Sequence, residues 1–395
     1  MQDVVIVSGA RTAIGKFGGA FKDVSAPALG ATVIKEALER ANLKADMVDE
    51  VVFGNALQAT EAGYAARLSS LQAGIPQEVP TIAINRQCSS GLEAINMAAQ
   101  LIRTGEADIA VAGGTENMSE APFLLDYKAR FDGLRLGDAK LIDGLVEGLG
   151  CPVNRYHMGV TAENVAERFG VSREDQDELA VISHQRASAA IKSNRFADQI
   201  VAISVPQRKG DPVTVAVDEG PREDTTLERL AQLAPVFKKD GSVTAGNASS
   251  INDGAAAVVM MSADKALELG LTPQLKWHTR GVAGVDPAIM GIGPVPAVRK
   301  ALDKAGMSIG DIDLIELNEA FASQAQYCIR ELGLDIDKTN VNGSGISLGH
   351  PIGATGAVLT VKLMEELARR DLELGVVTMC VGGGQGVATI FERVN

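Results

Sequence analysis

Cys88 is the side chain whose surroundings best fit a nucleophile. It lies between an apolar, strand-like run over 79–86 and a helical pattern over 92–102, among small residues. At the start of a helix, unpaired N–H groups and the helix dipole favour an anion, so we predict a lowered thiol pKa. Most isolated cysteines are inert core residues, but the position of this one favours a reactive thiolate.

A thiolate nucleophile needs a base and donors for an oxyanion, and the C-terminal part of the chain offers both. His350 lies in the glycine-rich turn 345–356, which opens a helix. Cys380 ends a strand pattern, and the following glycines, including Gly382, allow N–H groups to approach a ligand. Asn318 follows another strand pattern. Each has an ordinary explanation as a turn or cap, but together they predict one site. The other three histidines lack such surroundings and are interpreted from the residues alone as packing or surface residues.

The elements that must position these residues alternate between short apolar runs and helical patterns such as Leu29–Ala41 and Leu92–Arg103. This alternation indicates βαβ units and a mostly parallel, helix-covered sheet. An internal repeat supports two similar halves, because 37–53 aligns with 301–317, Gly91 with Gly356, and Gly113-Gly114 with Gly382-Gly383. The first half is predicted to be 1–118 and 245–268, the inserted region 119–244 and the second half 269–395. Within the insertion, we expect 173–192 and 207–211 to face solvent.

Composition excludes several classes of protein. The net charge of -13 over 395 residues disfavours general binding to nucleic acid or to an anionic membrane. The first residues lack the pattern of a signal peptide and no apolar run approaches the roughly 18 residues of a membrane span, so we expect a cytoplasmic protein. The four cysteines are far apart, without zinc-site spacing, and we predict no metal.

The chemically interesting segments together resemble the thiolase family over essentially the whole chain. The matching motifs are Asn-Arg-Gln-Cys-Ser-Ser-Gly at 85–91, Asn-Glu-Ala-Phe-Ala at 318–322, Gly-His-Pro-Ile-Gly-Ala-Thr-Gly at 349–356 and Cys-Val-Gly-Gly-Gly-Gln-Gly at 380–386. The resemblance implies that Cys88 accepts an acyl group, that His350 takes its proton, and that Cys380 exchanges a proton with the α-carbon of acetyl-CoA. His350 and a water held on Asn318 would stabilise the enolate. The N–H groups of Cys88 and Gly382 would form a second oxyanion hole.

The resemblance also implies an α/β fold of duplicated halves, each a mixed, mostly parallel sheet with helices on both faces, in five αβαβα layers. The inserted loop domain would bind coenzyme A. Residues implied to contact CoA or the acyl group are Leu145, His157, Met158, Arg222, Phe237, Ala245, Ser249, Met290, Ala320 and Phe321. Arg222, with Arg208 and Lys209 nearby in sequence, would meet the phosphates and adenine. The expected substrates are acetyl-CoA, acetoacetyl-CoA or another 3-ketoacyl-CoA, and CoA, with no further cofactor.

Different segments favour different branches of the family. His157-Met158 resembles the short-chain, acetoacetyl-CoA-forming branch, whereas Arg-Gln-Cys-Ser-Ser at 86–90 and the segment 318–325 resemble the degradative 3-ketoacyl-CoA branch. We favour an acetyl-CoA C-acetyltransferase over a β-oxidation thiolase. A non-catalytic acyl-CoA-binding scaffold and a decarboxylating ketoacyl-synthase-type enzyme are the other interpretations, and Cys380 disfavours the latter. The family's habit predicts a homodimer or homotetramer, with 119–150 resembling the region that joins dimers.

Overall fold

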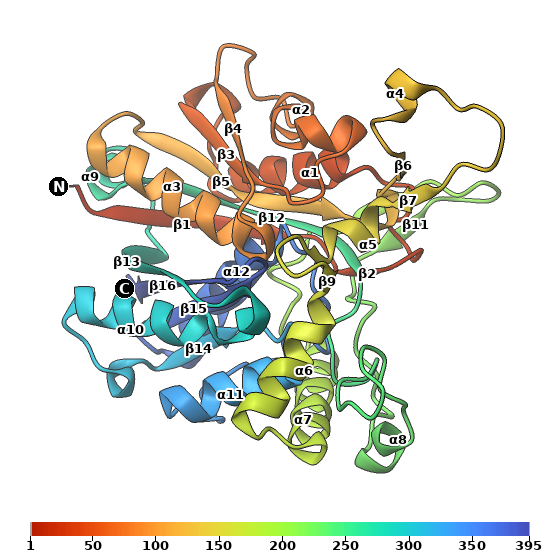
Figure 1. Cartoon of the computed structure of the whole chain (residues 1–395). Helices are drawn as coiled ribbons and strands as arrows, with labels where there is room; N and C mark the ends of the chain where they lie inside the picture. Colours follow the sequence, from red (N-terminus) through yellow and green to blue (C-terminus); the bar gives the residue numbers. More distant parts are fainter. Residues whose placement is uncertain (1, 395) are drawn as a thin grey trace.

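One long ten-stranded sheet runs through both halves of the chain in a computed structural model that describes residues 2–394 (Figure 1). Its strands, in spatial order, are β14 (Leu314–Leu317), β15 (Leu374–Val381), β16 (Gln385–Arg393), β13 (Leu275–Gly284), β1 (Val4–Arg11), β12 (Asn252–Ser262), β5 (Ile109–Asn117), β3 (Glu50–Gly54) and β4 (Thr81–Ile84), and the short β2 (Gly15–Lys16) pairs with β12. A brief β1–β13 ladder, from Val4 opposite Trp277 to Ile6 opposite Leu275, joins the two half-sheets.

The sheet is mixed, as expected, and its parallel pairing is found at the two edges. β4, β3 and β5 run parallel at one edge, and β14 and β15 run parallel at the other. The ladders between them, through β12, β1, β13 and β16, are antiparallel. Because the parallel strands of each half end at the same edge of their half-sheet, the segments that follow them can meet in one place.

Helices cover both faces of each half-sheet, which gives the predicted αβαβα layers (Figure 1). One apolar cluster packs α1 (Ala26–Arg40) and α2 (Ala65–Gln72) on the outer face of the first half-sheet. A second packs α10 (Pro294–Ala305) and α11 (Ala322–Leu332) on the outer face of the second. The central cluster contains α3 (Ser90–Thr104) and α12 (Thr355–Arg370) together with strands of both halves. These two helices therefore lie between the half-sheets.

The repeat is confirmed by the order of elements, but one of its landmarks was wrong. β3 pairs with β5 in the register in which β14 pairs with β15, so that Phe53 lies opposite Gly113 and Leu317 lies opposite Thr378. Gly113 is thus equivalent to Thr378, and not to Gly382 as the alignment predicted. The error arose because Gly113 lies inside β5, where it allows the close approach of Phe53 and of the β12 backbone, instead of following the strand.

The segment between β5 and β12 builds most of the remaining structure. Its elements are β6 (Phe123–Leu125), α4 (Ala129–Asp132), β7 (Leu141–Asp143), α5 (Gly144–Gly148), β8 (Gly150–Cys151), β9 (Tyr156–His157), α6 (Met158–Phe169), α7 (Arg173–Lys192), β10 (Ile203–Val205), β11 (Val213–Val215) and α8 (Leu227–Ala231), and α9 (Ala263–Glu268) follows β12. The segment 207–211 is exposed, as predicted. The solvent-facing prediction for α7 was wrong, because its small residues bury one face of the helix against α11. None of the helices in the described residues is long and apolar enough to span a membrane.

Candidate active site

The turn that carries Cys88 is held in an uncommon backbone conformation. Gln87 has a φ of 46°, in the left-handed region that side chains other than glycine seldom adopt. Two polar side chains stabilise it, since the Gln87 N–H donates to Asn85 Oδ1 at 3.1 Å and the Ser90 hydroxyl donates to the Gln87 carbonyl at 2.7 Å. Cys88 then lies in a single 3-10 turn, Gln87–Ser89, that leads directly into α3, as the sequence predicted.

The prediction of a lowered thiol pKa was wrong. Burial raises the pKa of the Cys88 thiol to about 11, and the N–H groups of Gly382 and of Cys88 itself only partly offset this effect. The negative charge of Glu116 raises the pKa further. Helix position alone suggested a thiolate, but the sequence does not show that the assembled halves half-bury this residue. The resting Cys88 is therefore a thiol, and it would need a base to act as a nucleophile.

His350 has the tautomer that such a base requires. The Thr355 hydroxyl donates to the Pro351 carbonyl at 3.0 Å, so it accepts the Nδ1–H of His350 at 2.6 Å. Nε2 is left with its lone pair, and the Asn318 amide nitrogen lies 3.4 Å from it. Burial lowers the pKa of His350 to about 4, so the imidazole is neutral at physiological pH and can accept a proton.

The turns of the two halves meet where α3 and α12 begin. A β-carbon on Gly91 would lie 3.0 Å from the Ala357 nitrogen, and one on Gly356 would lie 2.4 Å from the Leu92 nitrogen. This backbone contact between glycines is what brings the Cys88 turn and the His350 turn face to face, as the duplicated halves predicted. Gly91 and Gly356 also set the register of the repeat at 265 residues, which makes Asn85 the equivalent of His350.

Cys380 and Asn318 come from the neighbouring strands β15 and β14. Asn318 directly follows β14, and its N–H donates to the Thr378 carbonyl of β15 at 3.0 Å. Its Oδ1 is buried without a hydrogen-bond partner in the described part of the chain, so it can accept a bond from a water or a substrate. Cys380 is fully buried, and burial raises the pKa of its thiol well above the usual range, with the charge of Cys88 adding to the effect. Both sulfurs are therefore protonated at rest.

A predominantly apolar wall surrounds Cys380 and contains most of the residues predicted to contact the acyl group and pantetheine. Met290, Ala320, Phe321 and Cys380 pack in one cluster, against which Met158 and Phe237 also pack. His157 stacks on Phe237 with ring centroids 4.8 Å apart, and Phe237 meets Phe321 edge-on at 6.3 Å. Ser249 donates its N–H to the Ala320 carbonyl at 3.0 Å, next to this wall. Leu145 lies on the other side of the site, in a cluster that includes Cys88.

A separate cavity of about 250 Å³ has the basic lining predicted for the nucleotide end of CoA. Arg222 and Ala245 line it, as predicted, together with Lys16, Phe17 and His184. Burial lowers the pKa of His184 to about 4; the charges of Arg222 and Lys16 add to the lowering, and the charge of Asp224 opposes it. Arg208 and Lys209 lie on the exposed segment between β10 and β11 and do not line this cavity.

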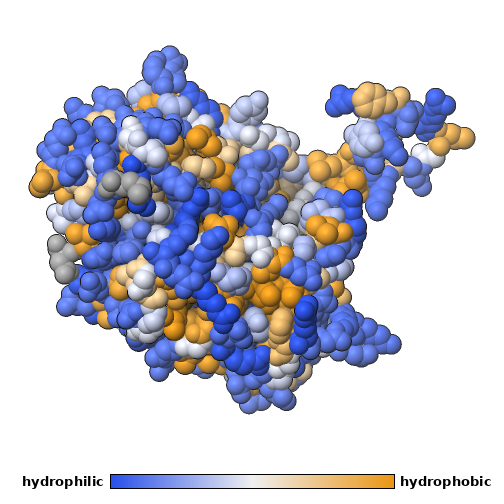
Figure 2. Space-filling view, turned by 60° about the vertical axis from the view of Figure 1, so that its left-hand side comes forward, coloured by the Kyte–Doolittle hydropathy of each residue, from blue (hydrophilic) through white to orange (hydrophobic). Residues whose placement is uncertain are grey.

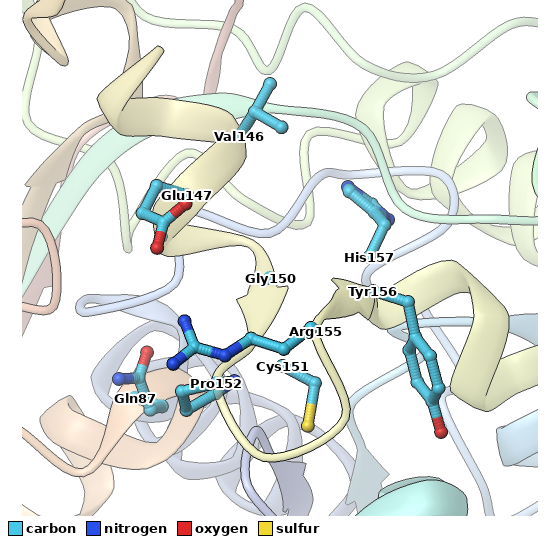
Figure 3. A pocket seen from close by; sticks show the side chains of 10 residues that line it. Gln87, Val146, Glu147, Gly150, Cys151, Pro152, Arg155, Tyr156 and His157 are labelled. Carbon is cyan, nitrogen blue, oxygen red and sulfur yellow. The ribbon is translucent and has the colours of Figure 1, made fainter. Parts of the chain in front are cut away.

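Another cavity, of about 400 Å³, opens next to the nucleophile turn (Figure 3). It is lined by Gln87, by the end of α5 and by the β8–β9 hairpin, including Cys151, Arg155 and His157. Figure 3 shows the Arg155 side chain extending towards Gln87 and Pro152. No group of three or more acidic, cysteine or histidine side chains within residues 2–394 is arranged to hold a metal ion.

Sequence reasoning missed the residues that hold the predicted ones in place. Thr355 sets the tautomer of His350, and Asn252 accepts the His350 N–H at 2.9 Å. Lys16 and His184 also line the basic cavity, and His184 is buried, in agreement with its interpretation as a packing residue. The threonine lies inside the histidine motif and could have been recognised at the start of its helix. Asn252 could not, because it is 98 residues away from His350 in sequence.

Thiolase family models match both halves of the chain. The family model for the thiolase N-terminal domain matches residues 4–264, and that for the C-terminal domain matches 271–393. An acetyl-CoA acetyltransferase of Pseudomonas aeruginosa is 54% identical over 394 residues, which cover 100% of each chain. The crystal structure of the Bacillus anthracis acetyl-CoA acetyltransferase superposes with a TM-score of 0.97 at 49% identity, covering 100% of this chain and 99% of that one. Human mitochondrial 3-ketoacyl-CoA thiolase in complex with CoA has a TM-score of 0.96 at 45% identity, covering 100% and 98%.

Proposed function

Because this chain belongs to the thiolase family, we propose that it is an acetyl-CoA C-acetyltransferase, which reversibly joins two molecules of acetyl-CoA into acetoacetyl-CoA and CoA. The observation that carries the proposal is the convergence at one place of the half-buried Cys88 thiol, the buried Cys380 thiol, a neutral imidazole whose Nε2 keeps its lone pair, and the Gly382 N–H. The names of the P. aeruginosa and B. anthracis relatives support acetyl-CoA as the substrate.

In the cleavage direction, Cys88 attacks the 3-keto carbon while His350 Nε2 takes the thiol proton. The bond between C2 and C3 breaks, and the protonated Cys380 gives its proton to C2, so acetyl-CoA leaves. The raised pKa of Cys380 suits it to act first as an acid. The thiol of CoA then takes the acyl group from Cys88, its proton restores Cys380, and the proton on His350 returns to Cys88.

The charge that develops in these steps has donors close by. The N–H groups of Cys88 and Gly382, which already face the sulfur, would bind the oxyanion on the acyl-cysteine. The enolate of acetyl-CoA would be stabilised by His350 and by a water held on the unpaired Oδ1 of Asn318. We place the nucleotide end of CoA in the cavity lined by Arg222 and Ala245, and its pantetheine along the wall formed by Phe237, Ser249 and Ala320.

Steady-state thiolysis of acetoacetyl-CoA against 3-oxooctanoyl-CoA, each with free CoA, tests the proposal. We expect a strong preference for acetoacetyl-CoA and loss of activity in Cys88→Ala. Comparable or better cleavage of the longer substrate would move the protein to the degradative branch. Failure to cleave either one would favour the acyl-CoA-binding scaffold. EDTA should leave activity unchanged, because no step requires a metal.

We also propose a cytoplasmic homotetramer assembled as a dimer of dimers. Two features support assembly: the edge strand β4, whose Ile82 is 39% exposed, and an arm formed by β6, α4 and β7. Figure 2 shows the arm standing clear of the body with hydrophobic residues on its surface. Its exposed apolar residues are Phe123, Leu124, Leu125, Tyr127, Phe131, Leu134, Leu136 and Leu141. Exposed apolar groups of this extent mark interfaces. Light scattering should report four chains in the full-length protein and two after deletion of 126–138.

A further inference from the structure

Glu116 is a buried carboxylate at the end of β5 that the mechanism above does not use. It is 1% exposed, and each of its oxygens accepts two hydrogen bonds. Oε1 accepts from the Asn55 amide at 2.9 Å and from the Leu57 N–H at 3.2 Å. Oε2 accepts from the N–H groups of Ala56 at 2.9 Å and Gly353 at 2.8 Å. All four partners of Glu116 are hydrogen-bond donors, so a side chain that donates hydrogen bonds could not replace the carboxylate without losing some of these bonds.

These bonds join the two halves at the positions that carry the reacting side chains. Gly353 belongs to the His350 turn of the second half. On the other side, the Ala56 carbonyl accepts a bond from the Asn85 amide at 3.1 Å, and Asn85 in turn holds the Gln87 N–H next to Cys88. One carboxylate thus connects the turn of the base to the turn of the nucleophile.

The backbone around Gly353 is closely packed where the His350 turn meets Glu116 and Ala56, so there is little room for a side chain at this position. A β-carbon on Gly353 would lie 2.6 Å from Glu116 Oε2 and 2.9 Å from the Ala56 nitrogen. The Gly353 carbonyl would in turn lie 2.2 Å from a β-carbon on Gly114 and 2.8 Å from one on Gly54. The turns can therefore approach each other closely, and the bonds to Glu116 fix their separation.

The charge of Glu116 also acts on the nucleophile. It raises the pKa of the Cys88 thiol, in addition to the larger effect of burial. The neighbouring strand β12 contributes Asp253, whose charge adds to the effect of burial in raising the pKa of Glu116 to about 7. Asp253 is itself bonded to Ser119 and does not contact the Cys88 turn through any bond of the described residues.

We propose that Glu116 is a positioning residue for acyl transfer, which holds the His350 turn and the Cys88 turn in register. The inference rests on the proposed function for its effect on turnover. Its effect on Cys88 can be measured without any acyl-CoA.

The test compares Glu116→Gln and Glu116→Asp with wild type in thiolysis and in alkylation of Cys88 by iodoacetamide, with Cys88→Ala as the blank. The glutamine amide would face two N–H donors, so kcat should fall by about 100-fold with little change in KM. Loss of the negative charge should lower the pKa of Cys88, so alkylation at a given pH should become faster. Glu116→Asp keeps the charge but shortens the reach, so kcat should fall while the pH profile of alkylation stays as in wild type.

Glu366→Gln is the matched control, because Glu366 is also fully buried and multiply bonded, but it pairs with Arg370 at the end of α12 and with Arg195, which follows α7. It should lower the melting temperature and leave kcat and alkylation unchanged. Unchanged kcat in both Glu116 variants would overturn the proposal. A loss of activity would also overturn it if the fraction of folded protein fell by the same factor and the rate of Cys88 alkylation did not change. If the glutamine variant does not fold, the aspartate variant decides. Wild type that is alkylated at Cys88 but cleaves no thioester would contradict the proposed function instead.

Discussion

The helix-opening turns of the two halves share one backbone plan but carry different chemistry. With the register set by Gly91 and Gly356, Asn85 of the first half is equivalent to His350 of the second, and Cys88 is equivalent to Gly353. The first half therefore places its reactive group where the second has only a hydrogen atom, and the second places its base where the first has an amide. Duplication supplied two helix starts facing each other, and divergence at two positions in each turn divided the proposed nucleophile and the proposed base between them.

We expect the largest loss of activity when His350 is replaced by asparagine, the residue that the first half carries at the equivalent position 85. In His350→Asn, the amide cannot take the proton of Cys88, whose pKa of about 11 leaves almost no thiolate at neutral pH. We expect kcat for acetoacetyl-CoA thiolysis to fall by about 10³-fold or more. A pH–rate profile that rises steadily towards alkaline pH would show that the thiolate must now form without a base. Wild-type activity in this variant would remove His350 from the mechanism.

The same variant should change how stability depends on pH. Since burial lowers the folded-state pKa of His350 to about 4, the unfolded chain binds a proton at higher pH than the folded chain does. Wild type therefore loses stability as pH falls from about 6.5 to 4, by about 3 kcal/mol from this group. Glu116, with its raised pKa, contributes in the opposite direction, because its stabilisation is lost as pH rises through about 7. Urea unfolding at pH 7 and pH 4.5 should show a smaller acid loss in His350→Asn than in wild type.

A methyl group at the position equivalent to Cys88 should have the next largest effect. In Gly353→Ala, the new β-carbon would meet Glu116 Oε2 and the Ala56 nitrogen, and these atoms are fixed by their hydrogen bonds. Relief requires the His350 turn to move, so we expect kcat to fall by about 100-fold and unfolding to become easier by about 1–3 kcal/mol. Gly310→Ala is a suitable control, because a β-carbon there meets only the Ser308 hydroxyl at 3.6 Å. Equal kcat values in the two variants would show that the backbone around Gly353 can accommodate a methyl group without displacing the His350 turn.

The contrast between the halves also explains what could be predicted from sequence. The strands, the helices that follow them and the reacting residues carry local signals, since Cys88, Asn318, His350 and Cys380 all lie where a strand pattern ends or a helix begins. Glu116 and Asn252 carry no such signal, because each acts through a bond to a residue 98 or more positions away. The sign of the Cys88 pKa shift was wrong for a related reason. Helix position is local, whereas burial depends on the assembled halves.

We expect the smallest loss of activity from changes to the two hydroxyl side chains at the starts of α3 and α12. Ser90 and Thr355 are equivalent, but within residues 2–394 Ser90 bonds only the backbone of Arg86 and Gln87, whereas Thr355 also accepts the Nδ1–H of His350. Thr355→Val removes one hydrogen bond from the imidazole and frees its other tautomer, so kcat should fall by about tenfold with KM unchanged. Ser90→Ala should lower the melting temperature and affect kcat less, because no reacting group depends on its hydroxyl. NMR of the His350 ring nitrogens in Thr355→Val would provide the decisive measurement: a retained Nδ1–H tautomer would show that Asn318 and burial suffice to set it.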